Sequence, residues 1–105
     1  MTPNAVQDPT SLLNEKVRVP QHVVYRSFPS ETVVLNLNTG RYHGLNVTAG
    51  RMLETLERAP NVRAAVLSLA AEYEQPAEVV ERDLCELCRS LLDRGLVEID
   101  GPLAS

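Results

Sequence analysis

The feature that most constrains this chain is a change of hydrophobic period at Leu45. Before this residue apolar and polar positions alternate, and after it apolar residues recur every three or four positions. A period of two is typical of strands with one buried face, whereas the longer period is typical of amphipathic helices. Strands followed by helices predict an α+β domain, in which an antiparallel sheet packs against a group of helices.

We expect three strands in the first half of the chain and a shorter one ahead of them. Residues 23–28 are rich in β-branched and aromatic types, and residues 32–37 alternate in hydrophobicity. The loop at residues 38–40 ends in glycine, which accepts the positive φ that short hairpin loops need, so residues 41–45 return as the partner strand. Residues 16–19 alternate as well and predict a short edge strand.

Three helices are expected after the hairpin, over residues 46–58, 61–75 and 77–94. Asn46 or Thr48 can cap the first and Asn61 the second, because their side chains accept backbone N–H groups. Gly95 is a natural C-terminal cap for the third. The core face of the second helix is expected to consist of Val62, Ala65, Val66, Leu69 and Tyr73. A last short strand over residues 96–99 completes a pattern that resembles a winged helix-turn-helix: a three-stranded N-terminal antiparallel sheet followed by three helices.

Length and composition exclude several classes of protein. The chain has 105 residues, a net charge of −4 and two cysteines. This length favours one domain, and no stretch approaches the roughly 18 apolar residues of a membrane span or the pattern of a secretory signal. The acidic balance disfavours polyanion binding, and two cysteines are too few for a disulfide scaffold, so we expect a cytoplasmic protein. Its parts would be a flexible arm over residues 1–15, a folded domain over 16–99 and a short tail over 100–105.

Motifs of enzyme chemistry do not occur in the sequence. It contains no nucleophile elbow, phosphate-binding loop or His-Glu-x-x-His helix, and His22 and His43 lie 21 residues apart in extended segments. Cys85 and Cys88 have the spacing of some metal and redox sites, but both lie in the middle of the third predicted helix. We therefore expect no catalytic residue, cofactor or metal, and we interpret the two cysteines as small buried hydrophobic residues.

The third predicted helix has a wider apolar surface than core packing requires. At about 100° per residue, a narrow arc is formed by Val80, Leu84, Leu87 and Leu91. Cys88, Leu92 and Cys85 extend this surface to about 140° from Val80, whereas a helix that covers a core needs a stripe of about 100°. Two interpretations stay open. The helix packs against both sheet and helices, or an apolar groove beside it receives a partner, such as a peptide added to an exposed strand edge.

Two segments are similar to a known family. Residues 33–46 read as an aliphatic strand, a Thr-Gly-Arg-Tyr turn and a Leu-Asn pair, and the small pair Thr48-Ala49 and an apolar helix follow. Residues 79–97 read as a last apolar helix that ends in Gly-Leu-Val. Together these segments, within about residues 16–99, resemble the PqqD-like family in the order of strand, turn, Leu-Asn pair and three helices.

This resemblance implies a recognition element for the precursors of ribosomally synthesised and post-translationally modified peptides (RiPPs). The leader of the precursor peptide would join the edge of the third strand, residues 41–45, and lie against the third helix. The domain would then present the peptide to a separate modifying enzyme, such as a radical SAM protein or a lasso-peptide protease and cyclase. A Gly-Arg-Tyr-His-Gly-Leu-Asn run is common in stand-alone members near lasso-peptide machinery, and PQQ-type cofactor maturation stays open as an alternative.

The peptide-binding residues that the resemblance implies are Arg41, His43, Gly44, Glu81, Leu84, Cys85, Cys88 and Leu92. Tyr42 and Leu45 are expected to anchor the core instead. Which flank of the third helix faces the strand edge does not follow from the sequence.

Two alternative functions remain. A winged helix that binds DNA would use the third helix for recognition, but that helix carries five acidic residues against Arg82, Arg89 and Arg94, and would repel phosphates. A structural subunit would use the wide helix face as a homodimer contact.

Overall fold

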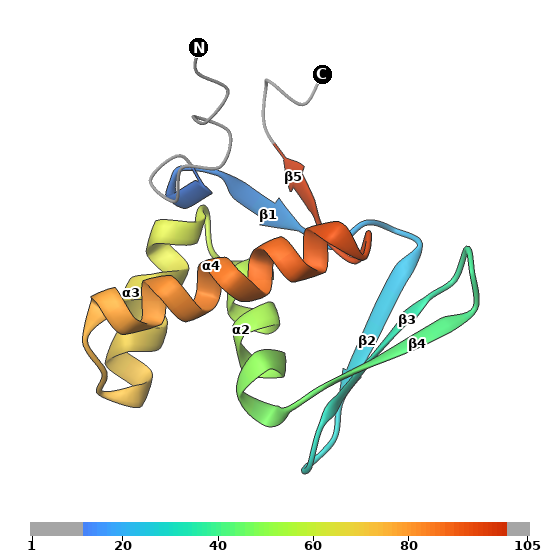
Figure 1. The fold of residues 1–105 in the computed structure, drawn as a ribbon, viewed down its shortest axis with the longest axis horizontal. Coiled ribbons are helices and arrows are strands. Elements are labelled where there is room, and N and C mark those ends of the chain that lie inside the picture. The colour runs from blue at the N-terminus through green and yellow to red at the C-terminus, as the bar shows by residue number, and fades with distance from the viewer. Residues whose placement is uncertain (1–11, 101–105) are drawn as a thin grey trace.

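The computed structural model describes residues 12–100. In chain order its elements are β1 (Lys16–Arg18), β2 (Val23–Ser27), β3 (Thr32–Asn36), β4 (Arg41–Leu45), α2 (Val47–Arg58), α3 (Val62–Tyr73), α4 (Ala77–Asp93) and β5 (Glu98–Asp100). The three-stranded sheet β2-β3-β4 projects from one end of the helical group, and β1 and β5 form a separate ladder (Figure 1). The predicted α+β architecture, with an antiparallel sheet followed by three helices, is confirmed.

The β3–β4 hairpin is closed by Asn36, which pairs with Arg41 across the strands. The Asn36 side chain accepts the backbone N–H groups of Asn38 and Thr39 at 2.9 and 3.3 Å. Gly40 has a φ of 76°, a conformation in which a β-carbon would be strained. The predicted hairpin and the need for glycine in its loop are confirmed.

The first and last strands form a ladder of their own. Residues 16–19, which were predicted as an edge strand, contain β1, but β1 pairs with β5 and not with the main sheet. The final strand begins two residues later than the start of the predicted segment 96–99. Leu96 and Val97 are instead buried in the core, so the chain reaches the surface only after them.

The residues just before β1 belong to the packed domain. Leu13 is buried in the core, and the Glu15 carbonyl oxygen accepts the backbone N–H of Val62 at 2.9 Å. Residues 1–11 and 101–105, which include most of the predicted arm and tail, lie outside the described residues.

The three predicted helices are confirmed to within a few residues at each end. Asn46 caps α2 by accepting the N–H of Ala49 at 2.8 Å, and Asn61 caps α3 by accepting the N–H of Ala64 at 2.8 Å. Gly95, with a φ of 72°, follows the end of α4 as expected. None of these helices is long and apolar enough to cross a membrane, within the part of the chain that the structure describes.

Two tyrosines that were expected in the core are exposed. Tyr42 is 72 % exposed, whereas Leu45 is buried at 6 %. The two lie three positions apart on one strand, so their side chains point to opposite faces of the sheet, and only one can face the helices. Tyr73 is 39 % exposed because it is the last residue of α3, where the chain turns away toward α4.

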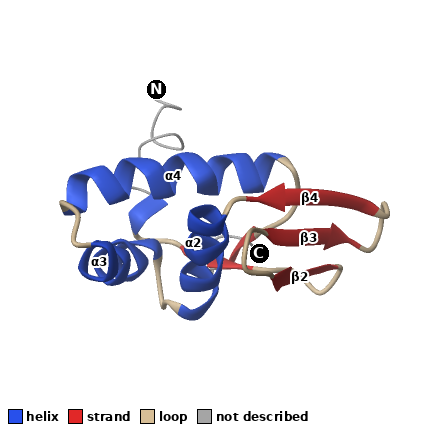
Figure 2. Ribbon diagram, turned by 90° about the horizontal axis from the view of Figure 1, so that it is seen from below, coloured by secondary structure: helices blue, strands red, loops and turns tan. Residues whose placement is uncertain are grey.

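The core lies between one face of the sheet and the helices. On the central strand β3, Thr32, Val34 and Asn36 are buried, while the two residues between them are only partly buried. Even-numbered residues of β3 therefore face the helices. The same face of β4 carries their cross-strand partners Arg41, His43 and Leu45. Figure 2 shows β4 as the strand of this sheet nearest α4.

Candidate functional site: the free edge of β4 and the adjoining groove

Strand β4 forms one edge of the three-stranded sheet. Within residues 12–100 no strand pairs with its outer side, because β4 follows β3 at the end of the strand order β2-β3-β4. An open edge leaves main-chain donors and acceptors free to pair with an added strand. The outer side of β4 is therefore a place where an extended peptide can bind.

Hydrogen bonds at the far side of β3 determine which groups of the sheet point outward. The backbone N–H of Leu37 donates to the carbonyl oxygen of His22 at 2.7 Å, and that of Phe28 donates to the carbonyl oxygen of Glu31 at 2.7 Å. In an antiparallel ladder, successive residues of a strand direct their N–H and C=O groups to opposite sides. The odd-numbered residues of β3 thus bond to β2, and the even-numbered residues bond to β4.

It follows that alternate residues of β4 face the free edge. His43 is opposite Val34 and bonds to it within the sheet, so its N–H is already used. Tyr42 and Gly44, which lie between the bonded positions, direct their N–H and C=O groups to the free edge. Gly44 is one of the predicted site residues. The backbone of Tyr42 is not, because the sequence predicts a core position for Tyr42, whereas its side chain is exposed.

A groove continues from this edge between the start of α2 and the middle of α4. It has a volume of about 390 Å³ and is lined by Asn46, Thr48, Ala49, Met52, Asp83, Glu86 and Leu87. Asn46 directly follows the last residue of β4, so the groove begins where the strand ends. A peptide that pairs with β4 can run on into it.

The predicted residues on α4 lie elsewhere. Leu84, Cys85 and Cys88 are buried in the core, and none of the five predicted α4 residues lines the groove. Glu81 and Leu92 are partly buried on the opposite flank of the helix. The peptide-binding role of these five side chains is not tested by this arrangement and stays a prediction. The groove lies on the other flank of α4, which carries Asp83 and Leu87.

The helical phase explains this difference. At about 100° per residue, Asp83 and Leu87 lie about 60° and 20° to one side of Val80, whereas Cys85 and Leu92 lie about 140° and 120° to the other side. The wider apolar flank packs inside the protein, and the narrower flank faces the groove. The sequence contains the phase of the helix but not the direction in which the sheet lies.

Both cysteines have the character of buried apolar residues. Cys85 and Cys88 are free thiols in the core. Burial, with smaller contributions from nearby charges, raises the pKa of Cys88 to about 11, and burial also raises the pKa of Cys85. A thiol with a raised pKa stays protonated near neutral pH and is a poor nucleophile or metal ligand. These properties support a packing role.

The free energy of unfolding is expected to fall at alkaline pH because the buried thiol of Cys88 loses its proton. Its pKa is about 11 in the folded protein against 9.0 ordinarily, so its contribution is fully present below pH 9 and is lost as the pH rises towards and through 11. This loss amounts to at most about 2 kcal/mol by pH 11. Between measurements below pH 9 and at about pH 10, the free energy of unfolding in urea should fall more for the wild type than for Cys88→Ala. Equal falls in both proteins would contradict the raised pKa of Cys88.

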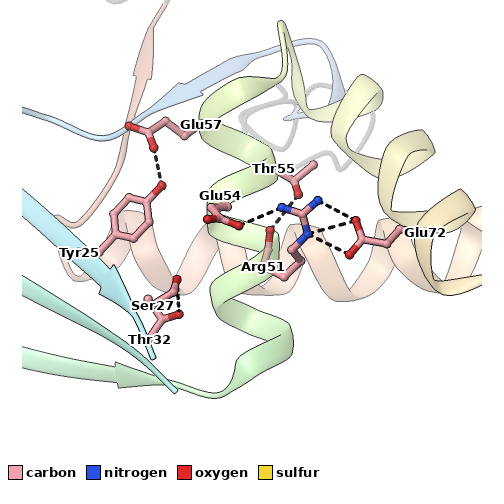
Figure 3. A network of polar contacts seen from close by, with 8 residues as sticks. All are labelled: Tyr25, Ser27, Thr32, Arg51, Glu54, Thr55, Glu57 and Glu72. Atoms are coloured by element: carbon pink, nitrogen blue, oxygen red, sulfur yellow. Dashed lines mark hydrogen bonds and ion pairs between the residues drawn. The ribbon is translucent and has the colours of Figure 1, made fainter. Parts of the chain in front are cut away.

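A polar network holds α2 in the position that forms the groove (Figure 3). Arg51 donates to both carboxylate oxygens of Glu72 on α3 and to Glu54 on its own helix, at 2.9 to 3.1 Å. The Arg51 hydrogen bonds hold the pKa of Glu72 below its usual range. On the other side, the Tyr25 hydroxyl of β2 donates to the Glu57 carboxylate of α2. Burial, followed by this bond, raises the pKa of Tyr25. The network ties α2 to both α3 and the sheet.

The outer face of the sheet is apolar and uncovered among the described residues. Its exposed hydrophobic side chains are Val24, Phe28, Leu37 and Tyr42. A shallow hollow of about 240 Å³ is lined on this face mainly by side chains of β2 and β3. Tyr42 connects this face to the free edge, since its backbone lies on the edge and its side chain on the outer face.

The chain is similar to known proteins over most of its length. Residues 31–97 match the model of a family described as coenzyme PQQ synthesis protein D, or PqqD. TbiB1, solved in complex with the TbiA(beta) leader peptide, is 33 % identical with a TM-score of 0.70, and the match covers 77 % of this chain and 94 % of that chain. Lasso peptide synthetase B1, solved in complex with its leader peptide, is 25 % identical with a TM-score of 0.70, and the match covers 79 % and 98 %. No curated protein matches this chain.

Proposed function

The chain belongs to the PqqD family, and we propose that it is a RiPP recognition element that binds the leader of a precursor peptide. The observation that carries this proposal is the free edge of β4, where the backbones of Tyr42 and Gly44 face outward beside a groove. The structures of TbiB1 and lasso peptide synthetase B1, each with a leader peptide, support it. The resemblance to this family that the sequence predicted is confirmed.

The proposed mechanism is recruitment without chemistry. Main-chain pairing with β4 supplies affinity for any extended peptide, and the groove adds selectivity for particular side chains. The bound peptide is then held near a separate modifying enzyme, such as a radical SAM protein or a lasso-peptide protease and cyclase, at a raised effective concentration. The chain itself acts as a binding module and not as an enzyme.

Other features fit this proposal better than its alternatives. Glu78, Asp83 and Glu86 are exposed on α4, the helix that a winged-helix protein would place on DNA, and they would repel phosphates. The wide apolar flank that a homodimer would use is buried inside the protein.

The experiment that tests the proposal is an NMR titration. The ¹⁵N-labelled chain is titrated with the leader of a small precursor encoded beside its gene. We expect the largest amide shifts at residues 42–46, on the free edge, and at residues 83–87 of α4. The amides of α3, which does not border the edge or the groove, serve as the internal control. Shifts centred on α3 or on β1 and β5 would place the binding site elsewhere and contradict strand addition at β4.

A further inference from the structure

The groove beside β4 combines an apolar floor with acidic side chains on one wall. Ala49, Met52 and Leu87 are partly buried and pack against the core, so they form the floor. Asp83 and Glu86 are exposed and supply the only formal charges among the seven lining residues. The groove therefore offers hydrocarbon below and two carboxylates at its rim.

These carboxylates are not neutralised from within the groove. Arg82 has its Nε at 3.7 Å from Asp83 Oδ1, but both side chains are at least half exposed, and such a pair contributes little. Glu86 also borders a second hollow on α4, which Arg82 and Arg89 line as well. Glu86 has no ion pair within the described part of the chain. An incoming cation would thus meet an acidic rim in which neither carboxylate is strongly paired.

The chemistry of such a groove fits a long basic side chain. Lysine and arginine place their aliphatic stem on apolar surface while their charged head stays at the rim. Arginine adds the possibility of two parallel hydrogen bonds to a carboxylate. An acidic side chain would be repelled by Asp83 and Glu86, and the nearby start of α2 offers it little, because Asn46 already caps that helix end.

The position of this residue in a bound peptide follows from the geometry of the edge. The backbone of Gly44 is the last outward-facing one on β4, and the groove begins two residues further on, at Asn46. An added strand advances about 3.3 Å per residue, as β4 itself does. Side chains of an added strand alternate between the two faces, and the residue opposite Gly44 directs its side chain to the outer face, so the peptide residue that enters the groove on the helix side is about one or three positions beyond it.

We propose that this site selects leader peptides that carry a lysine or arginine about one or three positions beyond the residue opposite Gly44, with its stem on Met52 and Leu87 and its charge beside Asp83 and Glu86. This inference rests on the proposed function. It specifies which chemical class of side chain the leader must contain and where in the leader that side chain must lie.

The test is a selection from a library of random 12-residue peptides displayed on phage. The baits are the full wild-type chain, a charge-reversed variant (Asp83→Lys with Glu86→Lys) and a matched control (Glu78→Lys with Asp93→Lys). The control changes the net charge by the same amount on the same helix, but neither of its residues lines the groove. We expect the wild type and the control to enrich lysine or arginine at one fixed position. The charge-reversed variant should enrich aspartate or glutamate there.

A binding measurement on the selected peptide gives the size of the effect. Replacement of its basic residue by methionine should weaken binding to the wild type about fivefold, as expected for an exposed charged contact, and should not weaken binding to the charge-reversed variant. Enriched peptides without a fixed basic position, or with the same basic position for all three baits, would overturn this inference and leave the proposed function standing. Failure of every bait to enrich any peptide would overturn both.

Discussion

Replacement of Gly44 by proline should weaken peptide binding at least about tenfold while the domain stays folded. The Gly44 N–H faces the free edge of β4, so proline removes a donor that only an added strand would use. Proline is tolerated on edge strands at such positions. A β-carbon at Gly44 would lie no closer than 3.4 Å to its nearest neighbour, the end of the flexible Glu31 side chain. Loss of the hydrogen bond from the Gly44 N–H to the peptide, together with interruption of the strand pairing around it, accounts for the expected tenfold weakening.

The matched control for this variant is His43→Pro. Its N–H bonds to Val34 within the sheet, so proline one position earlier should break the β3–β4 ladder and lower stability, whether or not peptide is present. Circular dichroism and urea unfolding measure the fold, and fluorescence anisotropy with a labelled leader measures binding. Normal binding by a folded Gly44→Pro variant would show that the peptide does not pair with this edge.

Replacement of Gly50 by alanine should destabilise the fold by about 3 kcal/mol. Gly50 is buried in α2 where the helix crosses β3, and a β-carbon there would lie 2.7 Å from the β-carbon of Thr32 and closer still to its hydroxyl oxygen. Rotation of the Thr32 side chain cannot relieve this overlap, because its β-carbon is fixed to the backbone of the central strand. Alanine would normally favour a helix by about 1 kcal/mol over glycine. A large loss of stability would therefore show that the overlap between α2 and β3 outweighs this helix preference.

Gly95→Ala is the control for this prediction. Gly95 has a φ of 72°, and no neighbouring atom lies within 4 Å of the position that a β-carbon would take, so alanine there introduces backbone strain without overlap. That strain costs about 1–2 kcal/mol. Urea denaturation should therefore place Gly50→Ala below Gly95→Ala in stability. A Gly50→Ala variant as stable as the wild type would mean that α2 and β3 are further apart than the structure has them.

Local patterns in the sequence were sufficient for the elements and their order. Alternation and the glycine of the hairpin loop predicted β3 and β4, and the side chains of Asn46 and Asn61 predicted the starts of two helices. These features succeed because each depends on groups within a few residues of one another. The family resemblance came from the same local patterns, and the match over residues 31–97 confirms it.

The candidate site was only partly predictable, because it depends on how distant elements face each other. The sequence indicated the strand that carries the free edge, and Gly44 on it. It did not show that Tyr42 points away from the core, since either face of a strand with mixed residues can be the buried one. It also did not show that Cys88 lies in the core and away from the groove, and the peptide-binding role that the resemblance implies for this residue stays a prediction.

By itself the sequence determined the secondary structure, the fold class and the kinship of this protein, because periodicity and capping act over short distances. Only the tertiary structure decided which backbone groups of β4 face outward and which flank of α4 lines the groove with Asp83 and Leu87. The first is decided by the pairing of β3 with both neighbours, and the second by the packing of the opposite flank of α4 into the core. Both are long-range contacts, and no local pattern in the chain encodes their direction.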